Sequence, residues 1–272
     1  MSQIDRSNSV HDLVHRVGAL GVPHGREDAF KLRPGQLLAD RVLLGVQRAA
    51  LPAAAFLSVL DELAIPCNGR DLLAARHADA NAILFAAEGS DSGVLLKVYL
   101  EFWDEVRRAV RAGAREPQLL HLGVKWSAAQ PGRHEEARYL CHPLLGLREI
   151  LRRMHDAHAQ ATGLQQAQAI VRRAAMRAPE AGFLYLEASE AGNPRSSYDV
   201  NLYKSGLQVQ DVAEELRAAA GGFGVDQEKM EALLRKLGPL PLGHIAGGRD
   251  RHGADFLSVY AEVAPLENWS ER

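Results

Sequence analysis

The polar face of one predicted strand carries a lysine, a tyrosine and a glutamate. In the segment 94–102, Lys97, Tyr99 and Glu101 alternate with apolar residues, and successive side chains of a strand point to opposite faces. Lys97 and Tyr99 therefore point the same way, roughly 7 Å apart along the strand. A lysine binds anions such as phosphate, and an aromatic face stabilises a cation by up to ~2 kcal/mol when water is excluded. These groups suit chemistry in which a diphosphate leaves and a carbocation forms.

Basic side chains gather on the polar faces of the early predicted strands. With Lys97 they form a set that is predicted to hold a diphosphate: Lys31, Arg33, Arg41, Lys125 and Arg138. Within the segment 138–144, Arg138 and His142 are placed on the polar face. The Asp-rich motif DDxxD, which chelates magnesium for a diphosphate, does not occur in the sequence. We therefore expect no required cofactor and no dedicated metal site, with magnesium as an optional companion of the substrate.

Tyrosines and acids occupy the polar faces of the later predicted strands. Tyr203 and Tyr260 are predicted to join Tyr99 in shielding a carbocation from water. Glu187 and Glu262 are candidate bases for the removal of a proton. Four further polar-face residues are predicted to line an acceptor pocket: His121, Tyr185, Asn201 and Ser258. For the histidines 121, 142 and 244, a hydrogen-bonded structural role is an equal alternative.

Paired strands must position these side chains. Turn residues separate the two members of each pair, and helical periodicity follows the first four pairs. The predicted pairs are 28–47, 81–88 with 94–102, 119–128 with 138–144, 182–190 with 196–206, and 242–248 with 255–263. The predicted helices between them are 52–64, 103–113, 147–159 and 209–220, with further helical material near 8–19, 164–176 and 227–237.

This order predicts an α+β fold in which repeated ββα hairpin units close ten antiparallel strands into a barrel. Closure removes exposed strand edges and turns the polar faces into one lumen, with the helices outside. A ten-stranded barrel is too wide for its own side chains to fill, so the lumen should bind a ligand. We expect a single domain over 1–272, with the barrel over about 27–263 and an N-terminal stretch of about 20 residues that is helical or partly disordered.

In this order of elements the chain resembles the soluble aromatic prenyltransferases with the ABBA barrel. The most specific pieces are the Lys-x-Tyr of 96–100, the hairpin 196–206 with its following helix, and the closing segment 242–263. The resemblance implies an enzyme that moves a prenyl group from an allylic isoprenoid diphosphate to an aromatic acceptor. It also implies that lysines and arginines hold the diphosphate while tyrosines shield the prenyl cation. The acceptor could be a phenol, an indole, a phenazine or a peptide side chain.

Composition excludes several other classes of protein. The formal net charge of −2 argues against a nucleic-acid binder, and two cysteines support neither a disulfide framework nor a zinc site. The polar N-terminal segment and the absence of a long apolar run predict a cytoplasmic protein without membrane contact. Two alternatives remain open: a non-catalytic carrier of an amphipathic anionic ligand, and a phosphoester hydrolase with an open α/β sheet.

Overall fold

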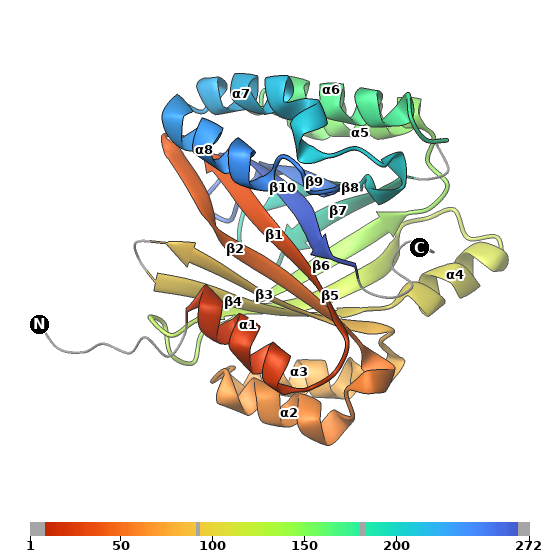
Figure 1. Cartoon of the computed structure of the whole chain (residues 1–272). Helices are drawn as coiled ribbons and strands as arrows, with labels where there is room; N and C mark the ends of the chain where they lie inside the picture. Colours follow the sequence, from red (N-terminus) through yellow and green to blue (C-terminus); the bar gives the residue numbers. More distant parts are fainter. Residues whose placement is uncertain (1–8, 91–92, 180–182, 266–272) are drawn as a thin grey trace, which may run out of the picture.

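Ten antiparallel strands close into a barrel, each strand pairing with its sequence neighbour and β1 pairing with β10 (Figure 1). The computed structural model describes residues 9–90, 93–179 and 183–265. The strands are β1 (His24–Arg33), β2 (Gln36–Gln47), β3 (Ala82–Ser90), β4 (Gly93–Glu101), β5 (Gln118–Ser127), β6 (Glu135–His142), β7 (Leu184–Glu190), β8 (Ser196–Asn201), β9 (Leu242–Arg249) and β10 (Asp255–Ala264). The predicted closed barrel is confirmed, and the open-sheet hydrolase hypothesis is wrong.

One helix precedes the first hairpin of the barrel, and the other helices connect successive hairpins. They are α1 (Val10–Ala19), α2 (Ala53–Glu62), α3 (Cys67–Arg76), α4 (Trp103–Arg111), α5 (Leu147–His158), α6 (Leu164–Ala175), α7 (Ala213–Gly222) and α8 (Gln227–Leu237). Helix α3 was not predicted, because its apolar residues do not form a clear stripe. Capping marks the starts of others: Ser9 and Asp12 form a capping box on α1, and Asp226 caps α8.

Seven of the eight described helices cover the outside of the barrel in two groups, and α4 packs separately against residues of β5–β7 (Figure 1). Helices α5–α8 pack over β1 and β8–β10, and α1–α3 pack over β2–β5, each group with its own apolar core. Leu96, Val98 and Leu100 of β4 lie in the second core, as the alternation predicts. The other face of β4 therefore points into the lumen.

The barrel has two chemically different ends. The two strands of each of the five hairpins are joined at one end, and the links to the helices leave from the other. Lys31 and Lys125 stand near the hairpin end of their strands, whereas Glu27 and Glu101 stand near the helix end. Order along the strands thus places the two lysines and these two acids at opposite ends, while other acids, Glu88 and Glu190 among them, pair with the cations at the hairpin end.

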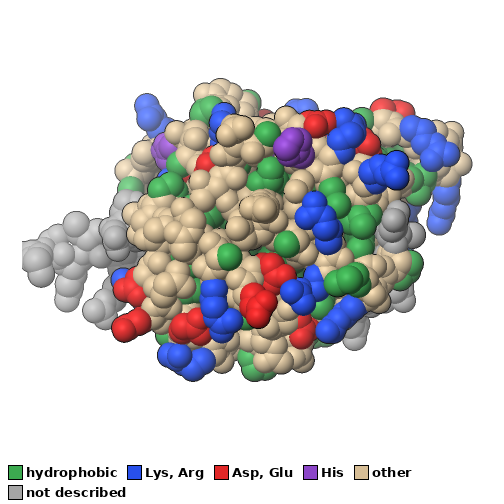
Figure 2. Space-filling view, turned by 90° about the horizontal axis from the view of Figure 1, so that it is seen from above, with side chains coloured by type: hydrophobic (Ala, Val, Ile, Leu, Met, Phe, Trp, Pro, Cys, Tyr) green, Lys and Arg blue, Asp and Glu red, His purple; other side chains and the backbone are tan. Residues whose placement is uncertain are grey.

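The outer surface does not share the cationic character of the lumen. On the face over α5–α8, basic and acidic side chains are interspersed (Figure 2). Many of them pair locally, as Arg152 does with Glu149 and Asp156 on α5. Within the described residues, no helix is long and apolar enough to cross a bilayer.

Candidate active site

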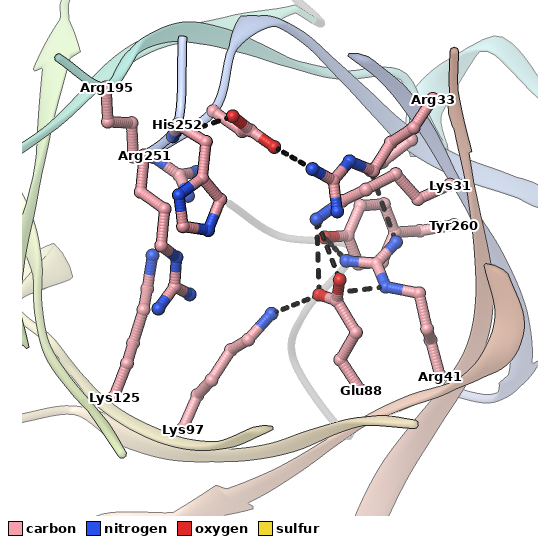
Figure 3. A network of polar contacts seen from close by, with 12 residues as sticks. Lys31, Arg33, Arg41, Glu88, Lys97, Lys125, Arg195, Arg251, His252 and Tyr260 are labelled. Atoms are coloured by element: carbon pink, nitrogen blue, oxygen red, sulfur yellow. Dashed lines mark hydrogen bonds and ion pairs between the residues drawn. The ribbon is translucent and has the colours of Figure 1, made fainter. Parts of the chain in front are cut away.

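Three cations from three strands surround one carboxylate in the lumen (Figure 3). Lys31 Nζ lies 2.9 Å and Lys97 Nζ 2.7 Å from the carboxylate oxygens of Glu88, and Arg41 Nε lies 3.3 Å from it. Arg41 also donates to Ser258 Oγ at 3.2 Å and to the Tyr260 hydroxyl at 3.3 Å. We call Lys31, Arg41, Lys97 and Glu88 the cradle.

A second group of cations faces the cradle across the lumen (Figure 3). Lys125 and Arg195 both pair with Glu190, which also accepts a hydrogen bond from Asn193. Arg195 donates a further hydrogen bond to the Tyr139 hydroxyl at 3.3 Å. The turn between β7 and β8 therefore adds a cation that no strand alternation could reveal.

A cationic mouth opens from these groups toward the hairpin end of the barrel. Seven Lys or Arg side chains and three carboxylates line it. Its rim is tied together by ion pairs between turns and strands, Arg33 with Asp250 at 2.9 Å and Arg251 with Glu135 at 2.8 Å. An excess of cations around a solvent-connected space is suited to a multivalent anion.

Burial makes this excess of positive charge costly in the free protein. It lowers the pKa of Lys31 to about 7, against the opposing attraction of Glu88, and it also lowers the pKa of Lys97. Burial alone would raise the pKa of Glu88, but Lys97 and Arg41 outweigh it and hold this pKa well below its usual range. A bound anion would relieve the repulsion among the cations.

An aromatic cavity continues from the mouth toward the helix end of the barrel. It holds about 1000 Å³ of empty space, part of it open to solvent, and Lys97 lines both the cavity and the mouth. Four tyrosines contribute to its wall: Tyr99, Tyr139, Tyr203 and Tyr260. The rings of Tyr99 and Tyr139 meet edge to face with centroids 5.6 Å apart. A side chain at Gly123 would collide with the Tyr99 ring, so glycine there permits this ring position.

One wall of the cavity holds a histidine between two carboxylates. His244 Nδ1 lies 2.9 Å from Asp199, and Nε2 lies 3.2 Å from Glu27, which also accepts a hydrogen bond from Tyr203. Burial alone would lower the pKa of His244, but Asp199 and Glu27 raise it well above the usual value. The imidazolium stacks on Tyr260 with ring centroids 3.8 Å apart. Because it is protonated, His244 is a poor proton acceptor.

The opposite wall holds a histidine with one carboxylate partner. His121 Nε2 lies 3.3 Å from Glu101 Oε2, and both residues line the cavity. The His121 ring meets the Tyr139 ring at 5.6 Å between centroids. If Nε2–H donates to Glu101, Nδ1 is left with a lone pair that can accept a proton.

Most of the predicted site residues do lie on the lumen side. Those that line the mouth, the cavity or the cradle are Lys31, Arg33, Arg41, Lys97, Lys125, Tyr99, Tyr203, Tyr260, His121, Asn201 and Ser258. Glu262 lies opposite Glu27 in the β1–β10 pair, and burial, followed by repulsion from Glu27, raises its pKa. Glu262 therefore keeps a proton more readily than an ordinary glutamate.

The predicted lumen positions of Arg138, Tyr185 and Glu187 are wrong. Arg138 pairs with Leu122, whose side chain points to the outer core, and it is exposed. Tyr185 packs in the core beneath the helices, and its hydroxyl donates to Glu187 at 3.3 Å. Glu187 in turn pairs with Arg153 on α5. The helix supplies a cation to this polar face, so the face can lie outside the barrel.

Because the inner and outer faces of β6 and β7 are exchanged relative to the prediction, residues that were not predicted point into the lumen. Tyr139 and Glu190 lie on the inner faces of β6 and β7, together with Leu184 and Leu186. The ladder between β5 and β6 contains an irregularity between Leu119 and His121. In a short alternating segment, either set of alternate residues can face the lumen. In β6 and β7 the more apolar set faces the lumen. Glu88 was missed because it follows an apolar run without alternating polar neighbours.

The described residues contain no group of three or more His, Cys, Asp or Glu side chains arranged to hold a metal ion. The acids of the mouth are instead paired with lysines and arginines. These contacts favour neutralisation of an anion by side chains.

Comparison with solved structures identifies the architecture. No family model and no curated protein matches the sequence. The crystal structure of 5-dimethylallyltryptophan synthase from Streptomyces coelicolor has a TM-score of 0.57 and 16% identity, over 92% of this chain and 83% of that one. The prenyltransferase PriB, in a ternary complex with L-tryptophan and dimethylallyl thiolodiphosphate, has a TM-score of 0.54 and 17% identity, over 90% and 82%. AnaPT from Neosartorya fischeri has a TM-score of 0.52 and 14% identity, over 89% and 79%. The chain therefore has the ten-stranded ABBA-type barrel fold that these prenyltransferases share.

Proposed function

We propose that the protein transfers a prenyl group from an allylic diphosphate to an aromatic acceptor inside the barrel. The observation that carries this proposal is the junction at Lys97, where the cationic mouth meets the cavity walled by tyrosines. A diphosphate in the mouth would place its allylic carbon in the cavity. The complex of PriB with L-tryptophan and a dimethylallyl thiolodiphosphate supports a short allylic donor and an aromatic acceptor.

The reaction begins with cleavage of the bond between the allylic carbon and the diphosphate oxygen. The electron pair of that bond leaves with the diphosphate, and Lys31, Arg41 and Lys97 stabilise the charge that develops on it. The allylic cation then lies among the faces of Tyr99, Tyr139 and Tyr260, which exclude water. A ring carbon of the acceptor forms the new bond, and the ring then loses a proton.

The geometry favours His121, oriented by Glu101, as the group that takes this proton. Glu187 is outside the barrel, and His244 is already protonated between two carboxylates. His121 lines the same cavity as the tyrosines and has one carboxylate partner that can hold its ring in place. This pairing replaces Glu187 as a candidate base, and it is preferred to Glu262 because His121 lines the cavity whereas Glu262 is not among its lining residues.

Replacement of His121 by alanine should slow removal of the ring proton and lower the rate of product formation by roughly 10²-fold or more. The diagnostic measurement is the primary isotope effect with an acceptor deuterated at the attacked carbon. Proton removal should become rate-limiting in the variant, so the isotope effect should appear or grow. His155→Ala, at an exposed position on α5, is the matched control. An unchanged rate and isotope effect would assign the base to another residue.

The function itself is tested with the purified protein, dimethylallyl diphosphate and a panel containing tryptophan, indole and simple phenols. We expect inorganic diphosphate and a prenylated aromatic product in equal amounts, with part of the activity surviving EDTA. Donor binding without turnover in the presence of every acceptor would support the carrier alternative instead. Hydrolysis at a rate independent of any acceptor would contradict prenyl transfer.

Donor affinity should depend on the protonation of Lys31. Burial, with repulsion from Arg41 and Lys97, outweighs the attraction of Glu88 and lowers the pKa of Lys31 to about 7. Lys31 is charged below this pKa and neutral above it, so donor affinity should fall by up to about tenfold per pH unit above pH 7. Calorimetric titration with dimethylallyl thiolodiphosphate from about pH 6 to about pH 8.5 measures this. Lys31→Arg, which stays charged, corrects for ionisation of the ligand. Identical pH profiles for the two proteins would rule out Lys31 as the cause.

A further inference from the structure

Glu88 is an acid at the centre of the site that is proposed to bind an anion. Its carboxylate contacts Lys31, Lys97 and Arg41, which come from β1, β4 and β2 (Figure 3). These are the cations that the proposed function gives to the diphosphate. A carboxylate there satisfies the cations when the site is empty, and it opposes the entry of a second anion.

We infer that Glu88 is an internal competitor of the diphosphate, which keeps the empty cradle assembled and weakens its affinity for both the donor and the diphosphate product. The inference rests on the proposed function and concerns how tightly the same site holds its ligand. Glu88 acts through the cations that it positions, so it is a positioning residue. It takes no part in bond formation or cleavage.

The contacts of Glu88 support this role. Both of its oxygens lie within 3.2 Å of Lys31 Nζ, and the nearer lysine, Lys97, lines both chambers of the site. Each lysine has three N–H donors, so the contacts to Glu88 leave donors for a ligand. The negative charge of Glu88, however, stays within a few ångströms of any diphosphate that binds these donors. The pKa of Glu88 is held well below its usual range, so this charge persists at neutral pH.

Another buried acid that pairs with lumen cations, Glu190, differs in its position. Glu190 pairs with Lys125 and Arg195 and is tied to the turn through Asn193. Glu88 lines the mouth itself, whereas Glu190 is absent from the lining of both chambers. Of the two, Glu88 is therefore the acid that a ligand would meet.

Competition between Glu88 and the diphosphate should speed release of the diphosphate product. Without Glu88, the bound diphosphate would take over the pairing that keeps Lys31 and Lys97 protonated. Together with Arg41 they would then hold the released diphosphate more tightly, because the attraction between opposite charges is strong where water is excluded. Product release would then limit kcat. The charge of Glu88 reduces the affinity of the site for product, at the expense of weaker donor binding.

The test compares Glu88→Gln with the wild-type protein, using inorganic diphosphate as the probe in calorimetry and thermal unfolding. We expect the variant to bind diphosphate at least roughly tenfold more tightly, since removal of one nearby buried charge is worth a factor of ten or more. The free variant should melt at a lower temperature, and diphosphate should raise its melting temperature more than that of the wild type.

In turnover by Glu88→Gln, both KM for the donor and kcat should fall, with stronger inhibition by diphosphate. Glu187→Gln removes the same charge outside the barrel and should change neither the affinity for diphosphate nor the kinetics.

Two outcomes separate this inference from the proposed function. If wild-type protein fails to bind inorganic diphosphate or any prenyl diphosphate, the proposed function is wrong. If it binds diphosphate and Glu88→Gln binds with equal or lower affinity, Glu88 is a structural partner only and the inference is overturned. Should Glu88→Gln not fold, Lys31→Met and Lys31→Met/Glu88→Gln make the same comparison with one cation fewer. Lys31→Met/Glu88→Gln should bind diphosphate about tenfold more tightly than Lys31→Met. Equal diphosphate affinities of these two variants would also overturn the inference.

Discussion

Replacing Lys97 by alanine should lower kcat/KM for the prenyl diphosphate by about 10²–10³-fold and leave the protein folded. Lys97 is the residue that lines both the cationic mouth and the aromatic cavity, so its charge lies where the breaking bond is expected. Its interaction with the leaving diphosphate strengthens as charge develops, so kcat should fall as well as donor affinity. Glu88 keeps Lys31 and Arg41 as partners after the change, which protects the cradle from an unpaired acid.

Steady-state kinetics and thermal unfolding of Lys97→Ala provide the measurement. Lys229→Ala is the matched control, because Lys229 lies exposed on α8 and carries the same charge. The control should keep both the activity and the melting temperature of the wild type. Wild-type turnover in Lys97→Ala would show that the diphosphate binds elsewhere.

Replacing Leu96 by aspartate should unfold the protein at room temperature, although Leu96 is the immediate neighbour of Lys97. Leu96 is 2% exposed and lies in the core between β2–β5 and helices α1–α3. The change removes a buried apolar side chain and places a charge against apolar neighbours, which costs at least about 4–5 kcal/mol. That minimum cost already reaches the lower end of the stability of a typical domain, about 5–15 kcal/mol.

Circular dichroism and the amount of protein recovered without aggregation measure this effect. Leu144→Asp makes the same chemical change at a residue that is 66% exposed and has a positive φ of 61°, a conformation that aspartate tolerates better than leucine. It should leave the melting temperature within a few degrees of the wild type. A folded Leu96→Asp protein would contradict the division of β4 into an outer apolar face and an inner polar face.

The inner and outer faces could be predicted wherever alternation was long and one-sided. In β4 and β10, apolar residues occupy every second position, and the polar residues between them line the lumen, as Tyr99 and Tyr260 do. In β6 and β7 the alternation assigned the inner and outer faces the wrong way round, because Arg153 of helix α5 pairs with Glu187 on the outer face. A polar strand face meets a helix without an unpaired charge when that helix supplies the counter-ion.

Sequence alone predicted the order of elements and several of the cations and tyrosines that face the lumen. Strand pairs, helices and lumen cations such as Lys97 follow from local periodicity and turn residues, which act over a few positions. Only the tertiary structure decided which groups meet. Glu88 contacts Lys31 across 57 positions of sequence, and His244 reaches Glu27 across 217. Closure of the barrel pairs β1 with β10 and brings these distant strands around one lumen. Ion pairing and protonation depend on distances through space. The cradle therefore needs β1–β4 to lie side by side, and the contact between His244 and Glu27 needs β1 to pair with β10.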